Sequence, residues 1–191
     1  MTKNFAWAAL LAASLPLING CAALAVGGAA AAVVVADDRR KTGVVVKDQE
    51  IELRAYDRLR DAFPGKVLDI STVSFNRHVL VVGQVPDEAT RAKITEIVGA
   101  IPSVAKVYNE TAIAGVASMA SEANDTIITT KVKARLVENG NISSNHVKVV
   151  TEAAVVYLMG LVTREEGEVA GKVAASTSGV SRVVKLFEYI E

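Results

Sequence analysis

Two stretches of the sequence decide the fold: residues 79–85 read VLVVGQV, and residues 156–162 read VYLMGLV. Each has an apolar residue at its first, third and seventh positions and a glycine at its fifth. Because residues two positions apart point to the same face of a strand, both stretches are predicted to be strands with one continuous apolar face. Gly83 and Gly160 are expected where a helix approaches the strand closely.

The two stretches lie 77 positions apart, and the same offset relates other residues of the chain. The matching pairs are Asp48 with Asp125, Ile51 with Ile128, Leu59 with Leu136, Gly83 with Gly160 and Val85 with Val162. Matches at one fixed offset indicate an internal repeat. Two copies of one small domain are therefore predicted.

Each copy is predicted to begin with a helix, for which Asp48 or Asp125 is the expected N-cap. Apolar residues recur every four positions along one face of this helix, namely Ile51, Ala55 and Leu59 in one copy and Ile128, Val132 and Leu136 in the other. The remaining elements of the two copies are predicted to be strands at 67–75 and 147–152, strands at 78–85 and 155–162, helices at 87–100 and 164–176, and strands at 104–113 and 180–190.

The predicted fold class is α+β, with two tandem αββαβ domains. In each domain the two helices are expected to pack on one face of a three-stranded mixed sheet. The connection between the copies, residues 114–124, is short and contains one glycine, so the two domains are expected to pack against each other.

The N-terminus is typical of a bacterial lipoprotein signal peptide. Lys3 provides a positive charge, residues 5–18 are almost entirely apolar, and a small residue precedes Cys21. We expect residues 1–20 to be removed, Cys21 to be acylated, and residues 21–46 to include a tether of Ala, Val and Gly. The alternatives are an ordinary secretory signal with an incidental cysteine, or a buried helix. Ala22 follows the cysteine where an inner-membrane retention signal has Asp, so resemblance to the bacterial sorting rule implies the outer membrane, facing the periplasm.

The composition of the 191 residues is that of a globular protein, with 51% hydrophobic and 22% charged residues, and it argues against wholesale disorder. The chain has 21 basic and 21 acidic side chains, so a strongly basic nucleic-acid-binding protein is not expected. One cysteine excludes an intramolecular disulfide. The expected partners are therefore membranes or proteins and not nucleic acid.

No residues have the spacing of a catalytic or metal site. The only two histidines, His78 and His146, are expected at the surface or in turns, and no nucleophile motif is present. Glu165, Glu166 and Glu168 are expected to complement the dipole at a helix start, with metal binding there as the open alternative. We expect a non-enzymatic protein without a cofactor or metal.

The first helices of the two copies differ in charge. Residues 48–61 contain five acids and three bases, whereas residues 126–137 contain three bases and no acid. The outer face of the second helix is predicted to combine a short apolar strip with flanking basic residues, as an interfacial helix does. The residues of this face are Ile127, Thr130, Lys131, Lys133, Ala134, Arg135 and Val137. The alternative is a solvated helix with a few exposed apolar residues.

The strand signature, the leading aspartate, and the later pairs Ser103-Val104 and Gly179-Val180 resemble the BON domain. Together with the lipoprotein signal and the runs ANDT at 123–126 and YLMGLVT at 157–163, the whole chain resembles the family of outer-membrane lipoproteins with two BON domains. The corresponding domain boundaries are 47–115 and 124–191, with a linker at 116–123.

This resemblance implies that the first helix of the second copy binds anionic phospholipid such as phosphatidylglycerol. It also implies localisation to the division site and a role in outer-membrane integrity. Related sequences commonly carry Trp where this chain has Ile127, and loss of that ring would weaken membrane contact. The alternative function is a periplasmic scaffold or regulator that contacts the β-barrel assembly machinery or the activators of septal peptidoglycan amidases.

Overall fold

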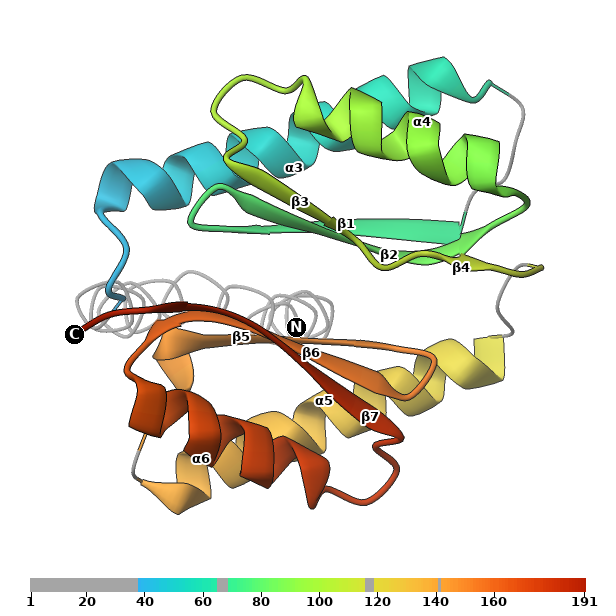
Figure 1. The fold of residues 1–191 in the computed structure, drawn as a ribbon. Coiled ribbons are helices and arrows are strands. Elements are labelled where there is room, and N and C mark those ends of the chain that lie inside the picture. The colour runs from blue at the N-terminus through green and yellow to red at the C-terminus, as the bar shows by residue number, and fades with distance from the viewer. Residues whose placement is uncertain (1–37, 65–68, 116–118, 141) are drawn as a thin grey trace, which may run out of the picture. The chain divides into compact units, whose positions relative to one another are not determined.

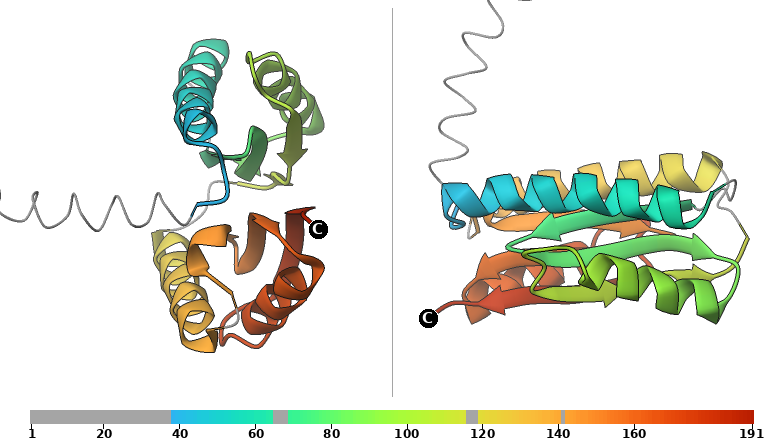
Figure 2. Two further views of the ribbon diagram at one scale, coloured as in Figure 1. Left: turned by 90° about the vertical axis from the view of Figure 1, so that its left-hand side faces the viewer. Right: turned by 90° about the horizontal axis from the view of Figure 1, so that it is seen from above.

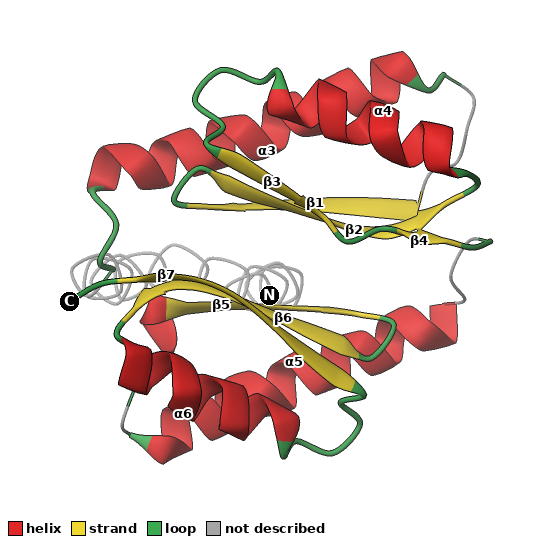
Figure 3. Ribbon diagram, in the orientation of Figure 1, coloured by secondary structure: helices red, strands yellow, loops and turns green. Residues whose placement is uncertain are grey.

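The structure is a computed structural model that describes residues 38–64, 69–115, 119–140 and 142–191. The expected signal peptide, Cys21 and residues 21–37 of the expected tether lie outside the described residues. Arg39–Glu191 form one compact unit. This unit contains two αββαβ copies, as predicted (Figure 1; Figure 3 distinguishes helices from strands).

The elements of the first copy are α3 (Thr42–Ala62), β1 (Asp69–Phe75), β2 (His78–Val85), α4 (Glu88–Gly99), β3 (Lys106–Asn109) and β4 (Ala112–Ile113). Those of the second are α5 (Met119–Asn139), the 3-10 turn η2 (Ser144–His146), β5 (Val147–Glu152), β6 (Val155–Val162), α6 (Arg164–Ala175) and β7 (Arg182–Tyr189). Both first helices begin earlier than expected, at Thr42 within the expected tether and at Met119 within the expected linker.

Both sheets are mixed, as predicted. The strand orders are β1-β2-β3 and β5-β6-β7, and each central strand runs antiparallel to the strand before it and parallel to the last strand. In the first copy the last strand is interrupted, whereas a single strand was expected at 104–113. The side-chain carbonyl of Asn109 accepts hydrogen bonds from the amide and the hydroxyl of Thr111, and this local turn separates β3 from β4.

Each central strand is buried on both of its faces. Val79 and Val81 of β2 point toward α3 and α4, where they pack with Ile51 and Ile94. The second copy repeats this arrangement with Val156 and Leu158 packed on Ile128 of α5 and Ala170 of α6. In the left-hand view of Figure 2, the two helices of each copy lie side by side on one face of that copy's sheet. The helix layer is therefore as predicted.

The opposite faces of the two central strands share a third apolar cluster. It contains Leu80 and Val82 of β2 together with Tyr157 and Met159 of β6, all at most 3% exposed. The prediction that the two copies pack against each other is therefore confirmed, and the contact joins the sheet faces that carry no helices.

The prediction that Asp48 and Asp125 are N-caps is wrong, because both lie inside their helices and are buried. Each carboxylate instead accepts hydrogen bonds from the two backbone amides of the turn between the first two strands. For Asp125 these are the amides of Ala153 and Ala154, both at 2.8 Å. The two alanines have φ of 48° and 61°. This left-handed conformation is costly for a residue with a Cβ atom, and the two hydrogen bonds offset the cost.

The prediction that a helix approaches the strand glycines is also wrong. A Cβ atom at Gly160 would collide with the backbone carbonyl of His146, and one at Gly83 with the carbonyl of Asp69. Asp69 is the first residue of the neighbouring antiparallel strand β1, and His146 immediately precedes the neighbouring strand β5. The glycines therefore allow close approach of two strands.

Candidate functional site

The outer face of α5 carries the apolar strip that the sequence predicts. Ile128, Val132 and Leu136 are buried toward the sheet, which turns the opposite side of the helix outward. Ile127 is 52% exposed and Val137 is 63% exposed, and Thr130 and Ala134 between them are exposed as well. The strip is thus accessible over three turns of helix.

The two lysines that border this strip are exposed. Neither Lys131 nor Lys133 takes part in an ion pair within the described residues. The acids of α5 lie outside residues 126–137, at Glu122, Asp125 and Glu138. The face between them therefore keeps its positive charge.

The corresponding helix of the first copy, α3, also has exposed apolar side chains, but two of its basic side chains are paired with acids. Leu53 and Tyr56 are 68% and 64% exposed. Arg54 forms an ion pair with Glu50 at 2.6 Å, and Arg60 lies 3.4 Å from Asp57 and 3.2 Å from Asp61. The charge difference between the two helices is therefore present in the folded protein.

Arg135, which the sequence placed with the two lysines, is half-buried and has a contact inside its own domain. Its guanidinium donates to the carbonyl of Val173 and to the hydroxyl of Thr177 near the end of α6. In the first copy, Arg58 donates to the carbonyl of Ala100 at the end of α4. At the repeat offset, Arg58 corresponds to Arg135 and Ala100 corresponds to Thr177, so the two copies share this contact. Arg135 thus joins the two helices of its domain, and the exposed positive charge of the face comes from Lys131 and Lys133.

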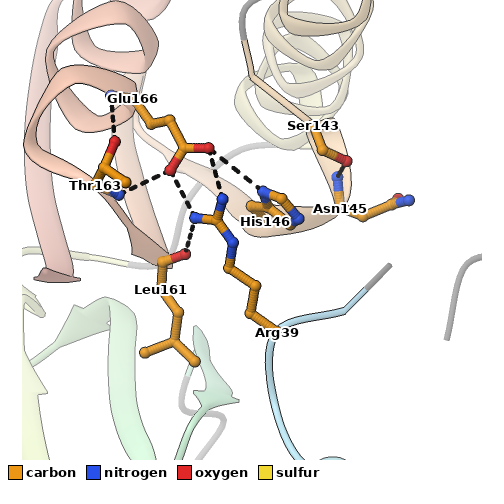
Figure 4. Close-up of polar contacts among 7 residues, drawn as sticks. All are labelled: Arg39, Ser143, Asn145, His146, Leu161, Thr163 and Glu166. Carbon is orange, nitrogen blue, oxygen red and sulfur yellow. Dashed lines mark hydrogen bonds and ion pairs between the residues drawn. The ribbon is translucent and has the colours of Figure 1, made fainter. Parts of the chain in front are cut away.

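A polar cluster at the start of α6 involves Glu166 (Figure 4). Thr163 and Glu166 form a reciprocal capping box, and Arg39 donates to both carboxylate oxygens of Glu166 and to the carbonyl of Leu161. The hydrogen bonds from Arg39 lower the pKa of Glu166 to about 2. Glu166 lies in the first turn of α6, where the acidic residues at 165, 166 and 168 were expected to complement the helix dipole. Sequence reasoning missed Arg39 as its partner, because the two are 127 positions apart.

His146 ends the 3-10 turn η2, in agreement with the expected turn position, and His78 is the first residue of β2. Neither side chain is at the open surface, since they are 11% and 18% exposed. His78 Nδ1 is 3.4 Å from a carboxylate oxygen of Glu188, and His146 Nδ1 is 3.6 Å from one of Glu166. Within the described ranges no group of three or more His, Cys, Asp and Glu side chains is arranged to hold a metal ion. The same ranges contain no helix that is long and apolar enough to cross a bilayer.

Comparison with known proteins gives a consistent set of similarities. The BON domain family matches residues 47–115 and 124–191. The chain is 34% identical to the outer membrane lipoprotein DolP of Haemophilus influenzae over 96% of this chain and 95% of that protein. It is 30% identical to the 21 kDa hemolysin of Actinobacillus pleuropneumoniae (78% and 77% covered) and 28% identical to the osmotically-inducible protein Y of Escherichia coli (75% and 73% covered). None of these three names denotes an enzyme.

Proposed function

Because the chain belongs to the DolP family of lipoproteins with two BON domains, we propose that it is a lipid-anchored protein of the outer membrane whose second BON domain binds anionic phospholipid. The binding surface in this proposal is the outer face of α5, with Ile127, Thr130, Ala134 and Val137 as its apolar strip. Lys131 and Lys133 supply the positive charge. The acylated Cys21 would hold the domain on the periplasmic side of the membrane.

The observation that carries the proposal is the combination of an exposed apolar strip with two lysines that form no ion pair with any described acid. Each lysine near an anionic surface contributes about 1 kcal/mol, and apolar side chains add to this when they enter the acyl boundary. Two such charges give weak binding by themselves. An acyl anchor makes weak binding sufficient, because it keeps the helix at a high effective concentration near the bilayer.

The proposal extends to the place and role of the protein in the cell. A domain that recognises phosphatidylglycerol would gather where that lipid is enriched, which we propose to be the division site. Its role there is maintenance of outer-membrane integrity, and it requires no catalytic group or cofactor. The similarity to an outer membrane lipoprotein supports the proposed location at the outer membrane. The positive charge of α5 supports the proposed preference for anionic lipid.

The test is co-sedimentation of residues 22–191, without acyl chains, with vesicles that either contain phosphatidylglycerol or are purely zwitterionic. We expect binding that needs the anionic lipid and weakens as salt is raised, since salt screens exposed charges. Lys131→Glu/Lys133→Glu should abolish it. The matched control is Lys47→Glu/Lys172→Glu, which makes the same charge change on α3 and α6.

Equal binding to both kinds of vesicle would contradict recognition of anionic lipid. Retention of binding in Lys131→Glu/Lys133→Glu, or an equal loss in the control variant, would show that α5 is not the binding surface. Circular dichroism of each variant verifies that it is folded.

A further inference from the structure

A groove of about 520 Å³ runs between α5 and β5, and it shares Thr130 and Lys133 with the lipid-binding face. Its walls include Thr129 and Lys133 of α5 and Lys148 and Thr151 of β5. Lys131 is not part of it. Because β5 is the first strand in the order β5-β6-β7, the groove follows the open edge of the second sheet.

The first copy closes the equivalent edge with a side chain. Glu52 of α3 reaches over β1 and accepts a hydrogen bond from the backbone amide of Ser74 at 2.8 Å. Such a cover prevents another strand from adding to the edge. At the repeat offset, the counterparts of Glu52 and Ser74 are Thr129 and Thr151.

The second copy lacks this cover. The hydroxyl of Thr129 donates to the hydroxyl of Thr151 at 2.7 Å, and among the described residues no side chain accepts from the Thr151 amide. The register of the two hairpins is the same, with Ser74 opposite Val79 and Thr151 opposite Val156. The Thr151 amide therefore points away from β6, as the Ser74 amide points away from β2.

Alternate residues of an antiparallel strand direct their backbone groups to the same side. Val149 therefore presents its amide and carbonyl to the groove along with Thr151. We propose that this groove binds an extended peptide segment of another protein, which adds to β5 as a further strand. Backbone hydrogen bonds would provide the affinity, and the side chains of the groove would select the sequence.

The charges of the groove indicate which sequence fits. Thr129 bonds to Thr151 and Asp125 bonds to Ala153 and Ala154, so α5 and β5 run in opposite directions along the groove. Lys133 consequently lies toward the Lys148 end, and Glu122 lies toward the Glu152 end. Acidic side chains gather at that end of the groove, so a cation is favoured there. Burial and the nearby carboxylates of Asp69 and Asp125 also raise the pKa of Glu152.

A partner strand that runs antiparallel to β5 enters at the Glu152 end and leaves at the Lys148 end. Its sequence should therefore have a basic residue followed four positions later by an acidic one, with β-branched residues between them. This inference does not depend on lipid binding, because it rests on the backbone groups of β5, which the lipid-binding face does not include. The two surfaces share Thr130 and Lys133, whereas Lys131 belongs to the lipid-binding face alone.

The test uses residues 22–191 and the capped peptide GTKVTVEG, with GTEVTVKG as the charge-swapped control of the same composition. Binding is followed by the amide resonances in ¹⁵N-labelled protein. We expect GTKVTVEG to shift the amides of Val149 and Thr151 in a saturable manner, and GTEVTVKG to bind at least tenfold more weakly.

Thr129→Glu installs in the second copy the cover that Glu52 provides in the first, and it should weaken binding of GTKVTVEG at least tenfold. Thr129→Val removes the hydroxyl contact without adding a cover, and binding should persist. Lys131→Glu should also leave binding of the peptide unchanged.

Absence of shifts at Val149 and Thr151 with millimolar peptide, or equal affinity in Thr129→Glu and wild type, would overturn the proposal. Equal binding of the swapped peptide would overturn the assigned charge preference. Competition by phosphatidylglycerol headgroup at the same amides would assign the groove to lipid.

Discussion

The guanidinium of Arg39 and the carboxylate of Glu166 form a two-pronged ion pair, with Nη1–Oε2 and Nη2–Oε1 distances of 2.6 and 2.8 Å. Arg39 lies shortly before α3, the first helix of the first copy, and Glu166 caps a helix of the second copy. The glutamate side chain is only 15% exposed. This pair therefore connects the N-terminal end of the folded unit to its C-terminal domain through a well-shielded contact.

Glu166→Gln should make stability less dependent on acid pH. The pKa of Glu166 falls from 4.5 to about 2 on folding, so as the pH is lowered the unfolded chain takes up this proton at a higher pH than the folded protein does. A carboxylate with a lowered pKa stabilises the folded state above about pH 4.5, and this contribution, at most about 3 kcal/mol, is lost as the pH falls toward 2. Urea unfolding at pH 6 and pH 3 should show a smaller difference in the variant than in wild type.

The matched control for Glu166→Gln is Glu168→Gln in the same helix. Glu168 pairs with Lys185 at 2.6 Å, but both side chains are exposed, and solvent-exposed pairs contribute little. The control should keep the wild-type pH dependence. An equal change in the pH dependence of both variants would show that the contact with Arg39 contributes no more to stability than an exposed ion pair does.

Asp125→Ala should destabilise the second domain by about 2–4 kcal/mol. The substitution leaves the amides of Ala153 and Ala154 without their acceptor and removes the interaction that holds both residues in the left-handed conformation. Glu138→Ala, at an exposed position of the same helix, should change stability by less than about 0.5 kcal/mol. Denaturant unfolding of both variants provides the comparison, and similar values for the two would refute the role given to Asp125.

The elements that sequence reasoning located best are those whose signal is local. The bounds expected for β2, β5 and β6 agree with the structure, because apolar alternation and the flanking turns are visible within a few residues. The role of Asp48 and Asp125 was not found in the same way. The atoms that each of them binds lie 28 and 29 positions further along the chain, and a helix N-cap is the nearest local explanation for an aspartate before an apolar run.

The contact between the two sheets had a signal that sequence reasoning left unused. Leu80 and Val82 alternate with the inward-facing valines of β2, so the strand is apolar on both faces, as strands covered on both sides are. The difference between Glu52 and Thr129 is also visible at the repeat offset. Its meaning depends on which strand edge each side chain faces, and only the three-dimensional arrangement provides that.

Ile127→Trp should strengthen binding to vesicles that contain phosphatidylglycerol. The indole ring favours the headgroup level of a bilayer, and position 127 is exposed on the lipid-binding face. Because Trp7 is the only tryptophan of the chain, residues 22–191 of this variant carry a single indole. Its fluorescence should shift to the blue when vesicles are added. Leu53→Trp on α3 is the matched control and should show no shift. A blue shift in the control alone would place the membrane contact on the first domain.

Leu80→Ala should loosen the second domain although the substitution is in the first. Leu80 is fully buried in the cluster that contains Tyr157 and Met159, and truncation of such a leucine costs about 2–5 kcal/mol through lost contacts and the remaining cavity. If the shared cluster couples the copies, wild type should unfold in one calorimetric transition. In Leu80→Ala, hydrogen exchange should become faster at amides of β6 as well as β2. Ile94→Ala, in the separate core of the first domain, is the control and should affect β2 more than β6. Wild-type protection of the β6 amides in Leu80→Ala would show that the two domains are energetically independent despite their contact.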